Sequence, residues 1–361
     1  MMPTNPVLVR EEAVVTEISS ENCDIQRVNA RGVHTGAIHK VIVYLALTGP
    51  VTPGDTIVIN TTATQLSLGT GGVDFAICTA HADRRESLPG HVMKLRYTPQ
   101  QMPVLACEAQ ESPHHEVMRE AVTLDGTPVI CLELHSQLAA VCHGAISRAR
   151  RPIRVAFVMT DQASLPIAFS ELVRTLRASQ VLCGTVTCGQ AFGGDLEAVS
   201  LFSGMLAAKT ILHADIIITG PGPGNVGTDT PFGFSAVDQG IVLNGAASLG
   251  GTPVMCVRAG SSDTRSRHNG LSHHSLTVLA RVVLAAVNIP VAANLDVSPL
   301  RATIATTHLA HKVHPMDVNV EWQDYLSLYP FVKSMGRPPE IEALLFQCAL
   351  AVGAWCAQTI D

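Results

Sequence analysis

The stretch that decides the fold is residues 216–229, Ile-Ile-Ile-Thr-Gly-Pro-Gly-Pro-Gly-Asn-Val-Gly-Thr-Asp. A short apolar run stops in a loop of alternating glycine and proline, and a new apolar-periodic segment, 234–249, follows it. This order predicts a buried strand, a tight turn and a helix. A glycine-rich turn between a parallel strand and a helix lets backbone N–H groups approach an anion at the helix N-terminus. The stretch therefore predicts where a ligand binds, but not which ligand.

Composition narrows the class of protein. The chain has 361 residues, which suits one large domain and one small domain. Hydrophobic residues make up 47% and charged residues 15%, a mixture typical of a well-buried α/β core. The net charge of −6 is mild, so nucleic acid is not an expected partner. The longest apolar segments are interrupted by Gly, Asp or His, so no membrane span is expected.

The positions of the cysteines and the sequence of residues 1–10 predict the cellular compartment. Several of the ten cysteines lie in apolar, strand-like runs, where a thiol behaves as a small hydrophobe. No CxxC pair is present, and residues 1–10 lack the pattern of a signal peptide. A reducing cytoplasm is therefore the expected location.

The chain is predicted to contain two domains. Residues 1–100 are expected to form a small, β-rich, barrel-like domain, because short β-branched runs alternate there with turns. Those runs are 12–18, 40–47, 55–60, 73–79 and 91–97. Residues 101–361 are expected to form a Rossmann-like α/β domain with a mostly parallel sheet, helices on both faces and a C-terminal helix. The expected strands are 104–107, 129–132, 155–159, 181–187, 215–219, 253–258 and 289–292, and the main helices are 136–148, 165–178, 195–213, 234–249, 272–287 and 339–358.

Polar residues gather in the loops that follow the predicted strands, whereas the strands carry almost no charge. Glu133 and His135, for example, come directly after the apolar run 129–132. In an open parallel sheet, ligands bind outside the carboxyl ends of the strands. The distribution therefore predicts a ligand site at this edge of the sheet.

The loop 263–274 carries the most ionisable residues. Arg265 and Arg267 supply planar guanidinium groups that fit a phosphate or a carboxylate. The alternative is a capped helix start, in which Ser272 is the N-cap and the arginines pair with surface acids. Because several ionisable residues share one loop at the expected edge, the binding role is favoured for the loop as a whole.

The same loop contains the candidates for proton transfer, which are Asp263, His268 and His273. With His274, these residues also form a candidate metal site. For each histidine taken alone, a structural role is the more common outcome.

Backbone amides of two glycine-rich turns are the other candidates for anion binding. Neither turn matches a Walker A loop or a dinucleotide-binding fingerprint. The alternative for the first turn is a rigid connection that only sets the angle between strand and helix. In the second turn, Asp195 is the expected N-cap of the next helix. The predicted ligand-binding residues of the two turns are Gly220, Gly222, Gly224, Asn225, Thr228, Gly193 and Gly194.

Four motifs resemble those of a bacterial family of conserved proteins catalogued only as a domain of unknown function. They are Gly-Ala-Ile-His-Lys at 36–40, Gly-Thr-Gly-Gly-Val-Asp-Phe at 69–75, Gly-His-Val-Met-Lys-Leu-Arg-Tyr-Thr-Pro at 90–99 and Arg-His-Asn-Gly-Leu-Ser-His-His at 267–274. The resemblance covers nearly the whole chain. It implies a bacterial, cytoplasmic protein and carries no activity, substrate or catalytic residue.

The leading hypothesis is an enzyme that acts on a small anionic metabolite, which is phosphorylated, nucleotide-like or a carboxylate. One alternative is a non-catalytic ligand sensor or assembly scaffold that uses the same site. A weaker alternative is a metal-dependent hydrolase that uses the histidines of loop 263–274. The sequence leaves open the cofactor, the reaction class and whether the chain forms a homodimer.

Overall fold

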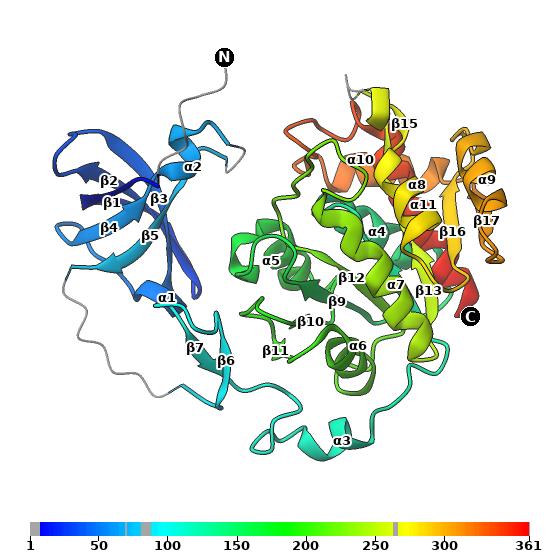
Figure 1. The fold of residues 1–361 in the computed structure, drawn as a ribbon, viewed down its shortest axis with the longest axis horizontal. Helices are drawn as coiled ribbons and strands as arrows, with labels where there is room; N and C mark the ends of the chain where they lie inside the picture. The colour runs from blue at the N-terminus through cyan, green and yellow to red at the C-terminus, as the bar shows by residue number, and fades with distance from the viewer. Residues whose placement is uncertain (1–7, 69–70, 81–87, 263–265, 361) are drawn as a thin grey trace. The chain divides into compact units, whose positions relative to one another are not determined.

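The structure is a computed structural model that describes residues 8–68, 71–80, 88–262 and 266–360 (Figure 1). It divides into two compact units. The first consists of Met1–Leu88 and Leu95–Met102, and the second of Pro89–Lys94 and Pro103–Asp361.

The first unit is built on a closed five-stranded β-barrel, which confirms the predicted barrel-like domain. Its strands are β1 (Arg10–Glu21), β2 (Ile25–Gly32), β3 (Ile38–Tyr44), β4 (Thr56–Asn60) and β5 (Asp74–Thr79), in the order β1-β2-β3-β5-β4. Neighbouring strands are antiparallel except for the parallel pair β3 and β5. Alternate residues such as Val28, Val41 and Ile57 fill the barrel interior. Two single-turn helices, α1 (Leu45–Thr48) and α2 (Thr62–Gln65), follow β3 and β4.

The structure differs from the prediction at two places in this half of the chain. Strand β2 was not predicted, because Arg27 and Arg31 interrupt its apolar pattern; its inward residues are nevertheless buried. The run 91–97 was expected in the barrel, but only β6 (Val92–Lys94) forms there, and it pairs with β7 (Met102–Val104) in a separate two-stranded sheet.

The second unit contains an eight-stranded parallel sheet, which confirms the predicted α/β class. The strand order is β11-β10-β9-β12-β8-β13-β16-β17. Every residue of β8, β9, β10 and β12 is buried, as expected for a parallel sheet that is covered on both faces. The strands are β8 (Pro128–Cys131), β9 (Val155–Thr160), β10 (Gly184–Thr187), β11 (Leu196–Glu197), β12 (Ile216–Pro221), β13 (Thr252–Met255), β16 (Asn288–Ala292) and β17 (Lys312–Met316).

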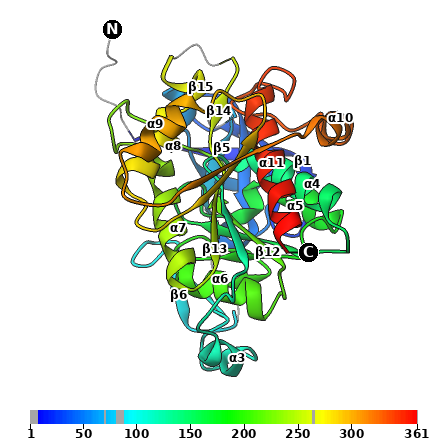
Figure 2. The same ribbon diagram turned by 90° about the vertical axis from the view of Figure 1, so that its right-hand side faces the viewer.

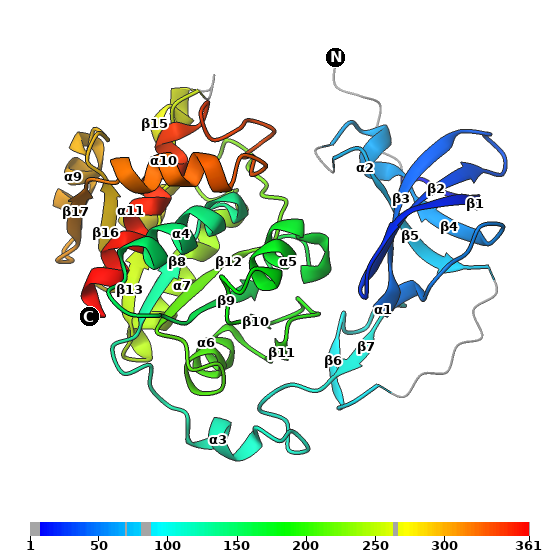
Figure 3. The ribbon, with the colours of Figure 1, turned by 180° about the vertical axis from the view of Figure 1, so that it is seen from behind.

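Helices cover both faces of this sheet. Figure 2 shows α7 and α8 on one side of it and α4 and α11 on the other, and Figure 3 shows α4, α10 and α11 in front of the sheet. The helices are α3 (His115–Glu120), α4 (Leu138–Arg148), α5 (Glu171–Ala178), α6 (Leu201–Thr210), α7 (Asp238–Ser248), α8 (His273–Arg281), α9 (Ser298–Ala305), α10 (Asn319–Leu328) and α11 (Ala343–Thr359). None of the helices in the described ranges is both long enough and apolar enough to cross a membrane.

The helix predicted to start at Asp195 begins later. Helix α6 starts at Leu201, and its N-cap is Ser200, whose hydroxyl accepts a hydrogen bond from the Ser203 amide. The Asp195 carboxylate is already engaged, because it accepts the Thr185 amide at 2.7 Å and pairs with Arg177 at 2.8 Å. The residues between form β11, a strand that was not predicted.

The strand order places the site. The chain leaves β8 toward α4 on one face of the sheet, and it leaves the neighbouring strand β12 toward α7 on the other face. Loops that diverge in this way at the carboxyl ends of neighbouring strands mark the usual ligand position in open α/β sheets. Functional side chains are therefore expected in the loops after β8 and β12.

Candidate functional site

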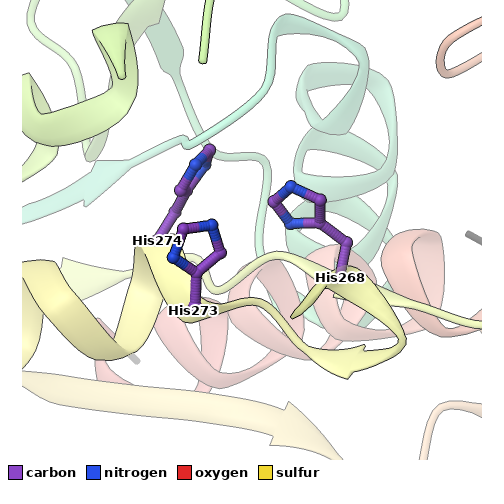
Figure 4. A group of neighbouring side chains, drawn as sticks. All are labelled: His268, His273 and His274. Atoms are coloured by element: carbon purple, nitrogen blue, oxygen red, sulfur yellow. The ribbon is translucent and has the colours of Figure 1, made fainter. Parts of the chain in front are cut away.

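Three histidine side chains converge beside these loops (Figure 4). His268 ends a short 3₁₀ turn (Ser266–His268), and His273 and His274 open α8. One ligand nitrogen from each imidazole lies within 4.8 Å of the others. The ring centroids are 4.4–5.1 Å apart. His268 and His274 are buried and His273 is half-buried.

The local sequence brings the three rings together. Strands β14 (Ala259–Gly260) and β15 (Gly270–Leu271) pair and lead the chain directly into α8. The Ser272 hydroxyl is the N-cap of that helix and accepts the His274 amide at 3.2 Å. The same hydroxyl lies 2.9 Å from Nδ1 of His268. One serine therefore starts the helix and fixes a ring of the cluster.

A buried carboxylate stands behind the cluster. Glu133 follows β8 and is 1% exposed. Its Oε2 accepts a hydrogen bond from the Ser275 hydroxyl at 2.5 Å, and its Oε1 lies 3.3 Å from Nδ1 of His274. Glu133 Oε1 has no hydrogen-bond partner in the described part of the chain, and a proton on Nδ1 of His274 would face it and leave the lone pair of that ring on Nε2. The His274 ring also stacks on Phe234 at 3.9 Å, so its orientation is fixed from two sides.

The spacing suits a transition-metal ion after a small adjustment. Three nitrogens that bind one tetrahedral Zn²⁺ lie about 3.3 Å apart, so the cluster needs to contract by about 1.5 Å at most. Nε2 of His273 has no hydrogen-bond partner in the described part of the chain. Burial, together with the nearby His274 and Arg267, lowers the pKa of His273. The neutral imidazole, which is the form that binds metals, is therefore favoured.

The glycine-rich loop after β12 reaches this cluster. The Asn225 side chain donates a hydrogen bond to the Glu133 carbonyl at 2.7 Å. A Cβ at Gly227 would lie 3.4 Å from Cε1 of His274, so the loop backbone borders that ring. Gly224 has a φ of +110°, a conformation that L side chains rarely adopt. The Thr228 hydroxyl donates to the Gly233 carbonyl at 2.8 Å and closes the loop.

Two glycines of the predicted anion cradle lie at its strand end. Gly220 is not in the loop as expected, because β12 continues to Pro221; a Cβ at Gly220 would lie 2.9 Å from Cβ of Leu132 on the neighbouring chain segment. Gly222 borders the Ser164 carbonyl, 2.6 Å from where its Cβ would lie. Close packing, against the Leu132 side chain at Gly220 and against the Ser164 backbone at Gly222, therefore accounts for the small residue at both positions.

The three remaining charged residues that were predicted at this edge differ in outcome. Arg267 forms an ion pair with Asp229 at 3.0 Å, and this pair joins the histidine loop to the glycine-rich loop. Asp263 and Arg265 lie outside the described residues.

Gly193 and Gly194 lie in a different polar network. Their amides donate to Glu197 Oε1 at 2.6 Å and to Thr187 Oγ1 at 3.1 Å. The other Glu197 oxygen is 3.3 Å from the ammonium of Lys94, a fully buried side chain. The amides of this turn are therefore used in the network around the Lys94–Glu197 ion pair.

His135 holds the β8 and β12 loops together. Its Nδ1 donates to the Pro221 carbonyl at 2.9 Å, because that carbonyl can only accept. Its Nε2 therefore accepts the Ser170 hydroxyl at 2.7 Å. Burial lowers the pKa of His135 to about 4, and the ring is neutral near pH 7. Its two nitrogens are both used within the protein, so it acts as a structural bridge.

The fold and the site are those of an α/β protein that has an N-terminal β-barrel and a candidate metal centre of three histidines. Residues 40–353 match a family described as "protein of unknown function (DUF3866)", and the chain belongs to that family. A search of curated proteins found no match.

Proposed function

We propose that this chain is a metal-dependent hydrolase that acts on a small anionic molecule. One observation carries the proposal: three imidazoles each place one nitrogen within 4.8 Å of the others, and a buried carboxylate faces one of the rings. Catalytic zinc sites use three protein ligands and keep a fourth position for water or substrate. Metal-bound histidines commonly donate their other ring nitrogen to a carboxylate, and Nδ1 of His274 lies 3.3 Å from Oε1 of Glu133, which has no hydrogen-bond partner in the described part of the chain.

Different residues of the site would bind the metal, position its ligands and attract the substrate. His268, His273 and His274 would hold the ion, and a divalent metal at this position supplies Lewis acidity and an activated water. Glu133 would act as a positioning residue, because its carboxylate faces Nδ1 of His274 and would favour a proton on that nitrogen. The guanidinium of Arg267 lies near His273 and pairs with Asp229, so an anionic substrate would compete with that carboxylate for the guanidinium.

Catalysis by a cysteine nucleophile is a less well-supported hypothesis for this chain. Cys188 follows β10 and is buried. Burial raises the pKa of its thiol to about 12, so the reactive thiolate is scarce at neutral pH. The histidine cluster is the better-supported reaction centre.

The first test is a zinc titration of chelator-treated protein by calorimetry. We expect one Zn²⁺ per chain, and an affinity about 100-fold lower in His273→Ala because one of three ligands is lost. His91→Ala is the matched control, since His91 is an exposed histidine that pairs with Glu111 and is not part of the cluster. Absence of stoichiometric binding, or equal affinity in both variants, would overturn the metal site.

The second test is turnover of anionic chromogenic esters. Zinc-loaded protein is compared with metal-free protein on p-nitrophenyl phosphate and on the mono-p-nitrophenyl ester of a dicarboxylic acid. Metal-dependent release of nitrophenol that is lost in His273→Ala supports a hydrolase. Stoichiometric metal without any turnover of either ester refutes the hydrolase and favours a ligand sensor.

A further inference from the structure

A cavity of about 680 Å³ opens beside the histidine cluster. Its walls come from α8, α9 and the segment Pro231–Phe232, and Figures 1 and 2 both place α9 next to α8. His273 is part of the wall. Ligand sites commonly have volumes of roughly 300–1,000 Å³, so the cavity is large enough for a metabolite.

The middle of the cavity is apolar. Leu276 and Ala280 of α8, Ala302 of α9 and Phe232 line it, and 58% of the Phe232 surface is exposed. Large apolar side chains that remain exposed around a concavity commonly mark a binding surface. The body of the ligand that fits here is hydrocarbon.

The far end of the cavity is cationic. Arg281 lines it, is exposed and forms no ion pair within the described part of the chain. His273, Leu276, Thr277, Ala280 and Arg281 lie on one face of α8. His273 and Arg281 are separated by about 12 Å along the helix axis, given the rise per residue of an α-helix.

We propose that the substrate has an apolar body with an anionic group at its far end. Its reacting end lies at the histidine cluster, its body lies over α8 and α9, and its terminal carboxylate pairs with Arg281. This inference rests on the proposed function, because it assigns the substrate class of the same centre. Charge complementarity supports it, since a metal site at one end and a guanidinium at the other suit an α,ω-dianion of medium length.

Calorimetry with three simple acids tests the inference. The probes are octanedioate, octanoate and butanedioate, titrated into zinc-loaded and into zinc-free protein. We expect octanedioate to bind the zinc-loaded protein at least about fivefold more tightly than either other acid, because only it reaches both charged ends. In Arg281→Gln, octanedioate should bind no better than octanoate. Arg301→Gln is the matched control, because Arg301 is an exposed arginine of α9 that does not line the cavity.

A second variant addresses the apolar body. Ala280→Trp fills the cavity and should weaken octanoate about tenfold or more while leaving the zinc titration unchanged. If zinc binds but octanedioate has no advantage, or the advantage persists in Arg281→Gln, the substrate assignment is wrong and the metal site stands. If zinc does not bind, the proposed function fails, and octanoate binding to the zinc-free protein still tests the cavity.

Discussion

Replacing Gly353 with alanine tests whether α4 and α11 pack backbone against backbone. A Cβ at Gly353 would lie 2.0 Å from the Val141 carbonyl oxygen and 2.6 Å from the Ala145 nitrogen. On the other helix, a Cβ at Gly144 would lie 2.2 Å from the Leu350 carbonyl oxygen. All these neighbours are backbone atoms, which cannot rotate away. The two helices must therefore separate to accept a methyl group.

The size of the effect follows from the geometry. Ordinary contact between that carbon and oxygen begins at 3.4 Å, so the two atoms must move about 1.4 Å apart, and a gap of even 1 Å forfeits about a quarter to a half of each dispersion contact across the interface. Helix α11 is buried along most of its length, so the loss involves many side chains. Alanine returns about 1 kcal/mol through its better helix propensity. We expect Gly353→Ala to lower the free energy of unfolding by about 3 kcal/mol or more.

Urea unfolding followed by tryptophan fluorescence measures this change. The chain has two tryptophans, and one of them, Trp355, lies on α11 with its ring 4.7 Å from that of His314. Gly245→Ala in α7 is the matched control, because its Cβ would meet only flexible side-chain ends, the nearest being Cε of Met205 at 3.3 Å. The control should change stability by no more than about 1 kcal/mol. Equal stability of the two variants would refute the close packing of α4 and α11.

Three further predictions concern buried polar groups. The pKa of His135 is about 4 in the folded protein, whereas an unfolded histidine titrates near 6.5. The contribution of neutral His135 to the free energy of unfolding is therefore fully present above about pH 6.5, and it falls by at most about 3 kcal/mol as the pH drops from 6.5 through 4. The urea midpoint of His135→Gln should depend less on pH over this range than that of the unaltered protein. Lys94→Met leaves the buried Glu197 carboxylate without its cation and should cost about 3–5 kcal/mol in urea unfolding, whereas adding Glu197→Gln should recover most of the loss. Glu133→Gln should weaken zinc binding about 10–100-fold by calorimetry with an unchanged circular dichroism spectrum, and an unaltered affinity would exclude its positioning role.

Most of the fold could be predicted because buried segments of the chain show apolar runs or apolar periodicity in the sequence. The central strands of the parallel sheet are continuous apolar runs, such as Ile216–Thr219, and turn residues separate the barrel strands. Elements without such an apolar pattern were not predicted. Strand β2 carries outward arginines, and β11 is only Leu196–Glu197, so neither shows a clear apolar pattern.

The candidate site could be predicted only in part. His268, His273 and His274 are close in sequence, so their clustering in one loop was expected. Glu133 contacts Ser275 across more than a hundred residues, and that contact depends on the position of β8 in the sheet. Its place directly after an apolar run was visible, but strand order is set by tertiary packing, which no local pattern encodes.

The most direct test of the metal site is X-ray absorption at the zinc edge of the zinc-loaded protein. The spectrum reports the number, type and distance of the ligands. We predict three imidazole nitrogens and one further oxygen at about 2.0–2.1 Å, and the loss of one imidazole in His273→Ala. A spectrum with sulfur ligands, or with fewer than three imidazoles in the unaltered protein, would contradict a centre built by His268, His273 and His274.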